Sequence, residues 1–415
     1  MGQRLVPHSG YRQKQAKLFN YVKTQGKITD ILKENSVGIV TSRDNFVFDT
    51  EEKRLKQKIY DFLNRDISDQ QLKAKYDLKE NKSWTINSCR TKLEIEKDKI
   101  KHQIYSCLYR PFDIQYLFYN ENIIERSRKE VMQHMVTREN VGLITCRQQS
   151  QQGVLWSLVG ISNKIMESCA ISNKTKEINN LFPLYVYPKV VKQKDFDYSF
   201  WPAGKDGRRP NLSPEFVEGL AEKIKLDFVS DGAGDLENTF GPEDVFHYIY
   251  AVFHSTEYRK RYAEFLKIDF PRVPWPKEKR IFVELCKVGE QLTGLHLMEA
   301  DILQDDKKWP KFDVKGSDIV ESGYPKYVAH ADLPEKEKVY INQDQYFEGV
   351  RPEVWEFHIG GYQVCEKWLK DRRGRKLDYE DICHYQKITT ALGETIKLMV
   401  LVDRVIDSNG VWPIK

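Results

Sequence analysis

The sequence predicts a mixed fold of helices and sheets, α/β (α+β), and three observations support this. A β-rich middle stretch of short β-branched and aromatic runs lies between helix-rich stretches. The 415 residues are roughly two to three times the usual domain length, which favours two or three packed units. Hydrophobic residues make up 40% and aromatic residues 12%, enough to fill such cores, which excludes a disordered chain.

The first elements are expected before residue 188. Residues 36–49 predict a buried strand, a turn at Ser42 to Asn45 and a second short strand. Residues 51–110 predict helices, and their 15 Lys and Arg against 10 Asp and Glu leave an excess of five positive charges, typical of a solvated helical face. From Ile104 to Pro188 the β-rich runs predict a mixed or antiparallel sheet.

The segment from Asp195 to Asn238 is expected to be an exposed excursion, because prolines and glycines interrupt it at positions 202, 204, 207 and 210. Helices resume at Gly241-Pro242-Glu243, since proline in a first turn followed by acids is a start signal. Three amphipathic helices are expected from three apolar stripes: Val245, Ile249 and Val252; Tyr258, Tyr262, Phe265 and Leu266; and Ile281, Leu285, Val288, Leu292 and Leu295.

The last part of the chain predicts a hairpin, or a strand turning into a basic loop, over residues 353–376. A final helix is expected to start at Asp378 and to run to about Asp407, because its apolar residues repeat at helical spacing. At 1.5 Å per residue this helix would be roughly 40 Å long, a suitable strut between modules.

Several classes of protein and site lack their signatures. No run of 18 apolar residues occurs, and the start MGQRLVPHSG has no apolar signal-peptide centre, so a cytoplasmic protein without membrane contact is expected. The seven cysteines are scattered without C-x-x-C spacing and the nine histidines form no ligand array, so no metal site is expected from adjacent ligands.

Motifs for catalysis are also missing. The sequence has no phosphate-binding G-x-x-x-x-G-K-[ST] loop, no G-x-S-x-G elbow, no dinucleotide G-x-G-x-x-G and no N-P-P-[YF] tetrapeptide of adenine methyltransferases. Glu94, Glu96 and Lys97 have the residue types of a nuclease site, but they lie on a charged helix-like stretch, where a solvated face is expected. No catalytic residue is therefore assigned.

A basic, amide-rich loop follows a predicted strand at residues 146–153. Arginine can bond both acceptors of guanine, and glutamine can pair with the donor and acceptor of adenine, so the loop suits base recognition. An ordinary polar hairpin loop is the alternative. The candidates are Arg147, Gln148, Gln149 and Gln151.

Phosphate contacts are predicted at three further places, although the overall charge of +5 is too small to indicate a general polyanion binder. One is the hydroxyl and guanidinium pair Ser42 and Arg43. The other two are basic loops, for which a loop without any partner is the alternative reading. Their candidates are Lys205, Arg208 and Arg209 in the excursion, and Arg372, Arg373 and Arg375 before the last helix.

Taken in order, several phrases resemble the C-terminal specificity region of type ISP restriction-modification enzymes. They are GIVTSRDNFVFD (38–49), YRPFDIQYLFY (109–119), NVGLITCRQQSQ (140–151), LFPLYVYP (181–188), and the longer stretches 240–276 and 355–388. The resemblance implies a sheet-based DNA target-recognition domain with a helical connector and coupling helices. Its expected units are a connector over 1–103, a recognition domain over 104–300, and a C-terminal β segment with a long coupling helix over 301–415.

The resemblance also implies the partners. The chain would read an asymmetric sequence in double-stranded DNA and position it for a methyltransferase that flips and methylates an adenine. The methyltransferase and translocase modules of the parent polypeptide would be its protein partners, and a fragment or truncated product is expected. S-adenosylmethionine, ATP and Mg²⁺ are expected only for the full-length parent and not for this chain.

The resemblance favours base contact by the loop at residues 146–153 over an ordinary polar hairpin loop. For Ser42 and Arg43 it implies either a phosphate contact or an interdomain contact. In the YRPFD phrase, Arg110 and Asp113 are expected to brace one another, while Tyr109 and Phe112 pack. Two other functions stay open: a degenerate or incomplete methyltransferase or nuclease built from scattered residues, and a scaffold that docks the other modules.

Overall fold

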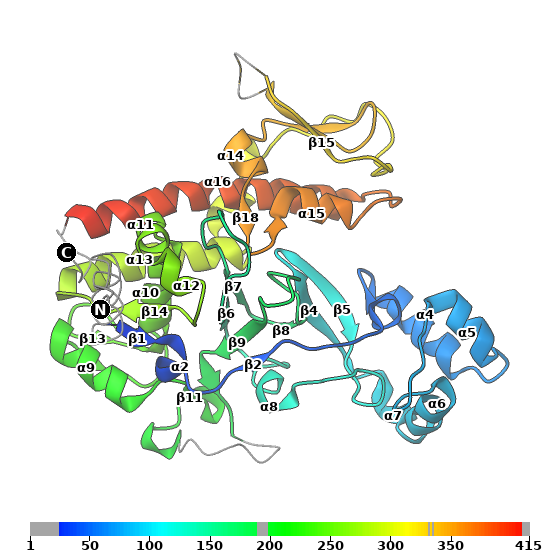
Figure 1. The fold of residues 1–415 in the computed structure, drawn as a ribbon, viewed down its shortest axis with the longest axis horizontal. Coiled ribbons are helices and arrows are strands. Elements are labelled where there is room, and N and C mark those ends of the chain that lie inside the picture. Colours follow the sequence, from blue (N-terminus) through cyan, green and yellow to red (C-terminus); the bar gives the residue numbers. More distant parts are fainter. Residues whose placement is uncertain (1–24, 189–197, 331–332, 334–335, 409–415) are drawn as a thin grey trace, which may run out of the picture.

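A computed structural model describes residues 25–188, 198–330, 333 and 336–408 of the chain. Helices and several small sheets alternate along it, so the predicted α+β class is confirmed (Figure 1). A helical lobe lies at one end, two four-stranded sheets lie in the middle, and a group of helices with one long helix lies at the other end. None of the helices in the described ranges combines the length and the apolar character needed to cross a bilayer.

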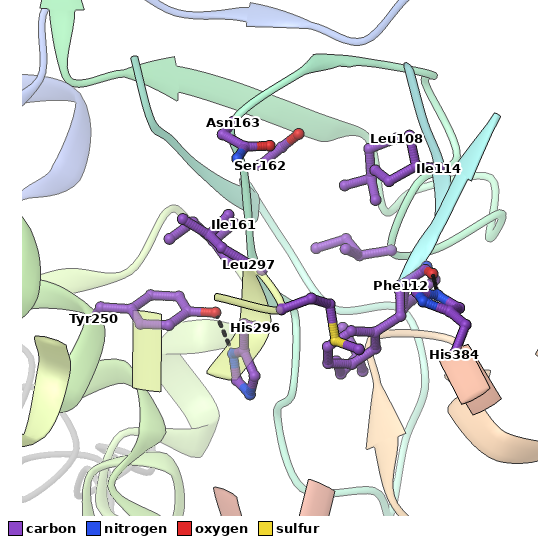
Figure 2. A pocket seen from close by; sticks show the side chains of 15 residues that line it. Leu108, Phe112, Ile114, Ile161, Ser162, Asn163, Tyr250, His296, Leu297 and His384 are labelled. Atoms are coloured by element: carbon purple, nitrogen blue, oxygen red, sulfur yellow. Dashed lines mark hydrogen bonds between the residues drawn. The ribbon is translucent and has the colours of Figure 1, made fainter. Parts of the chain in front are cut away.

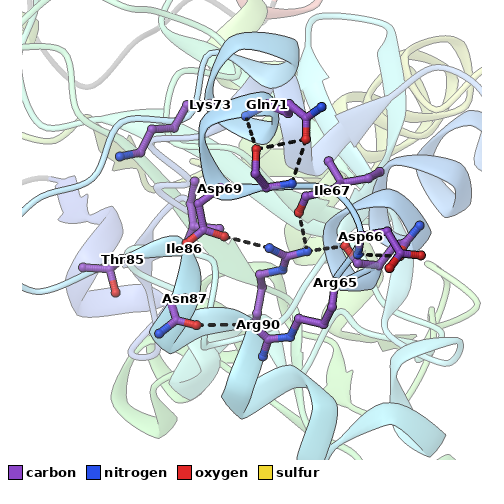
Figure 3. Close-up of polar contacts among 12 residues, drawn as sticks. Arg65, Asp66, Ile67, Asp69, Gln71, Lys73, Thr85, Ile86, Asn87 and Arg90 are labelled. Atoms are coloured by element: carbon purple, nitrogen blue, oxygen red, sulfur yellow. Dashed lines mark hydrogen bonds and ion pairs between the residues drawn. The ribbon is translucent and has the colours of Figure 1, made fainter.

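The helical lobe follows the predicted helical stretch. Leu55, Ile59 and Phe62 form the buried stripe of its first helix. The side chain of Arg90 fastens the lobe from inside, since its guanidinium donates to the Asp69 carboxylate at 2.7 Å and to the Ile67 carbonyl at 3.0 Å (Figure 3). The helices are α4 (Glu52–Leu63), α5 (Asp69–Tyr76), α6 (Ile86–Ile95) and α7 (Lys97–Ile100).

Glu94, one residue of the rejected nuclease set, lies on the surface of this lobe, next to the contact between Arg65 and Asn87 that Figure 3 draws. Arg65 at the end of α4 bonds Asn87 at the start of α6, and its Nε lies 2.6 Å from the Glu94 carboxylate. Both partners of that ion pair are more than 40% exposed. Glu94 therefore contributes to helix packing on a solvated face, as the sequence predicts.

Two four-stranded sheets form the β-rich middle. In the first sheet the order is β3-β5-β4-β8, and in the second it is β2-β9-β6-β7. In the second sheet, Cys146 at the end of β6 pairs with Asn179 at the start of β9. The strands are β2 (Ser36–Val37), β3 (Phe48–Asp49), β4 (Ile104–Arg110), β5 (Asp113–Phe118), β6 (Gly142–Cys146), β7 (Val159–Ser162), β8 (Ile165–Met166) and β9 (Asn179–Pro183).

The predicted helices after residue 241 are confirmed with one difference. The second stripe is divided into two short helices at Tyr262, whose backbone leaves the helical region. The long last helix runs beside the third stripe, and the two contact each other along their length (Figure 1). These helices are α10 (Pro242–His254), α11 (Thr256–Arg261), α12 (Ala263–Leu266), α13 (Lys279–His296) and α16 (Tyr379–Ser408).

The prediction of an exposed excursion is wrong for the described part, residues 198–238; residues 195–197 lie outside the described ranges. Helix α9 (Pro214–Ile224) begins there, because Ser213 caps it and Pro214 occupies its first turn. Trp201 is buried, and its indole donates to the Leu212 carbonyl. The prolines and glycines upstream made this helix signal easy to miss.

The C-terminal part contains the predicted hairpin, β18 (His358–Ile359) with β19 (Tyr362–Gln363), and two helices that the sequence analysis did not predict, α14 (Pro352–Trp355) and α15 (Val364–Lys370). A three-stranded sheet projects from the body above α16 (Figure 1). Its strands are β15 (Lys326–Val328), β16 (Lys338–Tyr340) and β17 (Tyr346–Glu348).

The remaining elements are short. In the described ranges they are β1 (Gln25–Lys27), α2 (Ile28–Ile31), α3 (Asp44–Val47), α8 (Lys129–Met132), β10 (Tyr185–Val186), β11 (Arg209–Pro210), β12 (Asp227–Phe228), β13 (Thr239–Phe240), β14 (Arg272–Pro274) and the 3₁₀ helices η1 (Tyr198–Phe200), η2 (Lys205–Gly207), η3 (Asp301–Gln304) and η4 (Asp306–Lys308). Strands β2 and β3 pair with strands beyond residue 104. The domain borders at 103 and 300 stay predictions.

Candidate nucleic-acid interface

The predicted base-reading residues lie on a long hairpin loop, residues 147–155, which we call the recognition loop. It leaves β6, an entirely buried strand that has neighbours on both sides. The hydroxyl of Thr145 donates to the Leu158 carbonyl at 2.8 Å and closes the base of the loop. Gly153, at a φ of 75°, makes a turn near its tip. The polar recognition loop is thus held at its base by a buried central strand.

A single buried carboxylate holds the recognition loop. Glu177 accepts hydrogen bonds from the backbone N–H of Ser150 at 2.8 Å and of Gln151 at 3.4 Å. It also accepts from the hydroxyls of Ser150 at 2.8 Å and Ser172 at 2.6 Å. Burial alone would raise the pKa of Glu177, but these hydrogen bonds outweigh it and hold the pKa below its usual value. The carboxylate is therefore ionised at neutral pH and binds the loop's main chain.

Most polar side chains of the recognition loop remain available. The side chain of Arg147 is 69% exposed, and its Nε lies 3.5 Å from the Asp269 carboxylate. Gln151 is exposed, and Gln148 is half-buried. The carboxamide nitrogen of Gln149 donates instead to the carbonyls of Gln151 and Val154, each at 3.0 Å. In this conformation Gln149 shapes the loop and lacks the free donor that pairing with adenine requires.

The structure brings a second loop beside the first, which the sequence analysis missed. Residues 173–178, which we call the lysine loop, lead into β9, and the pairing of Cys146 with Asn179 places the two loops next to each other. Lys174 and Lys176 are exposed there. The signal was present in the sequence as NKTKEI, but only the strand register shows that it lies beside residue 147. Apolar side chains are also exposed on these loops, at Val154 (42%), Leu155 (38%) and Ile178 (53%).

The prediction for Ser42 and Arg43 is not supported by their positions. Arg43 is buried, donates to the Ile123 carbonyl at 2.8 Å, and stacks 3.7 Å from the ring centre of Trp84 in the helical lobe. Burial lowers its pKa. The hydroxyl of Ser42 donates to the Glu125 carboxylate. Arg43 thus fastens the helical lobe to the sheets, and direct phosphate contact by its guanidinium is wrong for this conformation.

The basic residues predicted at positions 205, 208 and 209 also contact other residues of this chain. Arg208 is buried, with its Nε 2.6 Å from the Asp231 carboxylate and its guanidinium 3.9 Å from the ring centre of Tyr185. Arg209 donates to the Trp201 carbonyl at 2.9 Å. Lys205 is exposed but forms an ion pair with Glu139. The prediction is wrong for Arg208 and stays a prediction for Lys205 and Arg209.

The loop before the last helix, residues 371–376, is called the basic turn here. Arg372 is buried, with Nη2 2.9 Å from Asp113, Nε 3.3 Å from Asp381, and its guanidinium 3.4 Å from the ring centre of Trp368. A phosphate contact by Arg372 is therefore wrong in this conformation. Arg375 shares Asp381 at 3.3 Å, whereas Arg373 is exposed and donates to the Tyr324 carbonyl.

The same contacts correct the predicted brace in the YRPFD phrase. Asp113 bonds Arg372, and Arg110 bonds the Glu167 carboxylate at 2.6 Å, so Arg110 and Asp113 do not form an ion pair with each other. Phe112 is buried and Tyr109 packs against the core, as predicted.

A small, partly open cavity of about 70 Å³ lies between the two sheets and the helices α10, α13 and α16 (Figure 2). Tyr250 and His296 are hydrogen-bonded at its edge, and burial lowers the pKa of His296 to about 3, so its imidazole is neutral. Sites for drug-sized ligands begin at about 300 Å³. This cavity therefore does not fit S-adenosylmethionine or ATP.

A metal site is not formed either. In the part of the chain that the structure describes, no three His, Cys, Asp or Glu side chains are grouped so that they could hold an ion. The donor set for Mg²⁺ is thus not assembled from these residues.

A family model described as the type ISP C-terminal specificity domain matches residues 30–401. Comparison with curated protein sequences finds no match. Among solved structures, similarity is found to a DrdV–DNA complex studied by cryo-EM, with a TM-score of 0.62 and 19% identity over 89% of this chain and 36% of that one.

Two further similar structures are type ISP restriction-modification enzymes. One is a nuclease-deletion mutant of LlaGI in complex with a DNA substrate mimic, with a TM-score of 0.57 and 19% identity over 92% of this chain and 29% of that one. The other is ATP-dependent LlaBIII bound to DNA, with a TM-score of 0.58 and 16% identity over 92% of this chain and 24% of that one. The chain thus spans about a third or less of each of these proteins.

Proposed function

The chain belongs to the type ISP C-terminal specificity domain family, and from this premise we propose that it recognises a base sequence in double-stranded DNA. It would do so as the specificity part of a restriction-modification enzyme that methylates adenine. The similar structures named above are complexes with DNA or a DNA mimic, which supports the choice of partner.

The observation that carries the proposal is the recognition loop with its anchor. Glu177 binds main-chain N–H groups and the Ser150 hydroxyl of the loop and leaves the side chains of Arg147, Gln148 and Gln151 to other partners. The Nε of Arg147 lies 3.5 Å from Asp269, and 69% of this side chain stays exposed to a ligand. A loop whose backbone is fixed and whose polar side chains are free suits the reading of base edges in a groove.

The neighbouring lysine loop suits the positioning part of the interaction. Ammonium groups of Lys174 and Lys176 would neutralise phosphates beside the bases that are read, which adds affinity but no sequence information. The exposed Val154, Leu155 and Ile178 would pack against sugars or thymine methyl groups. Affinity and discrimination would therefore come from adjacent but different side chains.

Selection from a random pool of duplexes would identify the target, and fluorescence anisotropy would then compare target and scrambled duplexes over a salt series. We expect tighter binding to the target and affinity for both duplexes that falls steeply with salt. Equal affinity for the two duplexes, or affinity that does not respond to salt, would contradict the proposal.

The other modules belong to the proposal as well. We propose that methyltransferase and translocase modules of a parent polypeptide are protein partners in the cytoplasm, and that S-adenosylmethionine, ATP and Mg²⁺ bind to those modules. Tyr60 on α4 and Ile95 on α6, which are 70% and 83% exposed, offer apolar contact for a neighbouring module. Calorimetric titration of this chain with S-adenosylmethionine should give no heat of binding; saturable binding would favour the methyltransferase alternative.

A further inference from the structure

A basic groove lies between the projecting sheet and α16, far along the chain from the recognition loop. Its volume is about 710 Å³, and it is lined from β17, α14, α16 and the turn near Trp309. Figure 1 shows α14 and the projecting sheet on one side of α16 and β18 on the other. The recognition loop lies on the β18 side, since the N–H of Gly360 in that hairpin bonds Ser157.

The groove carries more cations than acids. Two carboxylates, Glu348 and Glu394, line it. Two of its cations have no carboxylate within ion-pair distance among the described residues, namely Lys311 and Lys336, and both are exposed. The full set of lining cations is Lys308, Lys311, Lys336, Arg351 and Lys397.

A glycine keeps the floor of the groove open. Gly393 lies inside the 30-residue helix α16, where glycine is less favourable than alanine. A Cβ at this position would lie 3.2 Å from Nη2 of Arg351. The guanidinium of Arg351 thus occupies space beside the helix that a larger residue would restrict.

The positive charge continues onto the exposed face of the projecting sheet. The Glu348 carboxylate lies 3.7 Å from Nζ of Lys338. The ammonium groups of Lys338 and Lys315 lie 4.0 Å and 4.5 Å from the ring centre of Tyr346, and their contacts, with the Lys315 hydrogen bond first, lower the pKa of Tyr346. Two like charges that converge on one ring repel each other, and a bound anion would relieve that repulsion.

We propose that this groove, with Lys315 and Lys338 at its end, binds the phosphodiester backbone of DNA outside the bases that the recognition loop reads. The proposal rests on the proposed function, because DNA is the polyanion that the family would bring to this surface. Aromatic and ammonium groups side by side suit a nucleic-acid strand. Lys311 and Lys336, which form no ion pair among the described residues, suit phosphate charge, whereas the other three lining cations pair with carboxylates.

The test uses the full chain and target duplexes with short and long flanking sequence. For the wild type, longer flanks should raise affinity, and the double variant Lys311→Gln with Lys336→Gln should lose this increase while keeping its preference for target over scrambled DNA. The slope of log affinity against log salt should become less steep by about two. For each lost phosphate contact, the drop in affinity between about 50 and about 200 mM salt should be roughly threefold smaller.

Two further variants sharpen the result. Lys223→Gln with Lys287→Gln removes the same charge from exposed positions on α9 and α13 and should leave the flank effect intact. Gly393→Ala removes no charge but crowds Arg351, and it should weaken the flank effect in part. Circular dichroism would confirm that each variant is folded.

Three outcomes would overturn the groove proposal. The first is a gain in affinity from longer flanks that is equal in the wild type and in the Lys311 and Lys336 variant. The second is a loss of this gain in the Lys223 and Lys287 control as large as in the groove variant. The third is saturable binding of inorganic phosphate with no gain from longer flanks, which would indicate a small-anion site. A wild-type chain that prefers no duplex sequence would instead contradict the proposed function, so the two failures are distinguishable.

Discussion

The recognition loop and the basic turn were both predicted to contact DNA, and in the structure their polar side chains are held in opposite ways. In the recognition loop, the carboxylate of Glu177 binds main-chain N–H groups and hydroxyls. In the basic turn, the carboxylates of Asp113 and Asp381 bind the guanidinium groups themselves. The first loop therefore presents its side chains to a ligand, and the second uses its central side chain to join distant parts of the chain.

The difference shows that arginines and polar residues in a loop can be taken up by internal partners to very different extents: Arg147 keeps 69% of its side chain exposed although it pairs with Asp269, whereas Arg372 is buried by its carboxylates. Arg372 and Asp113 are 259 positions apart, and Arg208 and Asp231 are 23 apart. Local sequence contains no sign of either pair. Where the carboxylate goes to the backbone instead, as with Glu177, the same residue types remain functional candidates.

The largest effect is expected for Arg372→Ala, which tests the structural side of the comparison. The Asp113 carboxylate would stay buried without its partner, and breaking a buried ion pair in this way typically costs about 3–5 kcal/mol. Urea denaturation should therefore show the free energy of unfolding falling by that amount, while the folded fraction keeps its DNA preference.

Arg373→Ala is the matched control, because Arg373 is exposed in the same turn and should change stability by less than about 0.5 kcal/mol. A fully stable Arg372→Ala variant that loses DNA affinity would contradict the comparison and restore a phosphate role for Arg372.

The next effect concerns discrimination. Replacing Arg147 and Gln151 together by alanine should lower the ratio of target to scrambled affinity by about 30-fold or more, because two base contacts of about 1–3 kcal/mol each would be lost. Stability should hardly change, since both side chains are exposed. Anisotropy titrations with the two duplexes measure the ratio. An unchanged ratio would favour the scaffold alternative, in which DNA is read elsewhere.

Much of the fold could be predicted from the sequence because its signals are local. The stripe of Val245, Ile249 and Val252 and the start at Pro242 correspond to α10, and the final helix begins within a residue of its expected start at Asp378. Helix α9 was missed because its start signal at Ser213 and Pro214 follows a stretch rich in proline and glycine. The periodicity of apolar residues thus predicted the long helices, but it did not predict α9, α14 and α15, which lie next to turns.

The candidate site could be predicted only in part. The recognition loop was found because one segment contains both its polar residues and the strand that positions them. The lysine loop was missed because it joins the site through strand pairing between Cys146 and Asn179. The burial of Arg43, Arg208 and Arg372 depends on partners that only the tertiary structure brings near.

A smaller effect is expected at the anchor. Glu177→Gln keeps the shape of the side chain but removes the charge, so the hydrogen bonds from Ser150 and Ser172 weaken. Discrimination should fall about tenfold, and stability by about 1–3 kcal/mol. Ser172→Ala is the control, because it removes a hydrogen bond from Glu177 but leaves those of the recognition loop, and it should retain most discrimination.

The same anchor predicts a pH dependence with a definite sign. The pKa of Glu177 is lower in the folded protein than in the unfolded chain. The ionised carboxylate therefore stabilises the folded protein fully above the unfolded pKa of about 4.3, and this stabilisation is lost as the pH falls through the lower folded pKa. Discrimination should therefore be constant from about pH 8 to about pH 5 and decline below about pH 4. A decline near pH 6 would exclude Glu177 as the controlling group.

The smallest effect should come from the lysine loop. This test distinguishes side chains that contact phosphates from side chains that contact bases. If Lys174 and Lys176 each contact one phosphate, Lys174→Gln with Lys176→Gln lowers the salt slope by about two and weakens target and scrambled duplexes by the same factor. The ratio between the duplexes should stay at the wild-type value, unlike in the Arg147 and Gln151 variant. Removing the same charge at Lys223 and Lys287 should leave both quantities nearly unchanged. A fall in the ratio would mean that the lysines read bases, and an unchanged slope would mean that this loop does not face DNA.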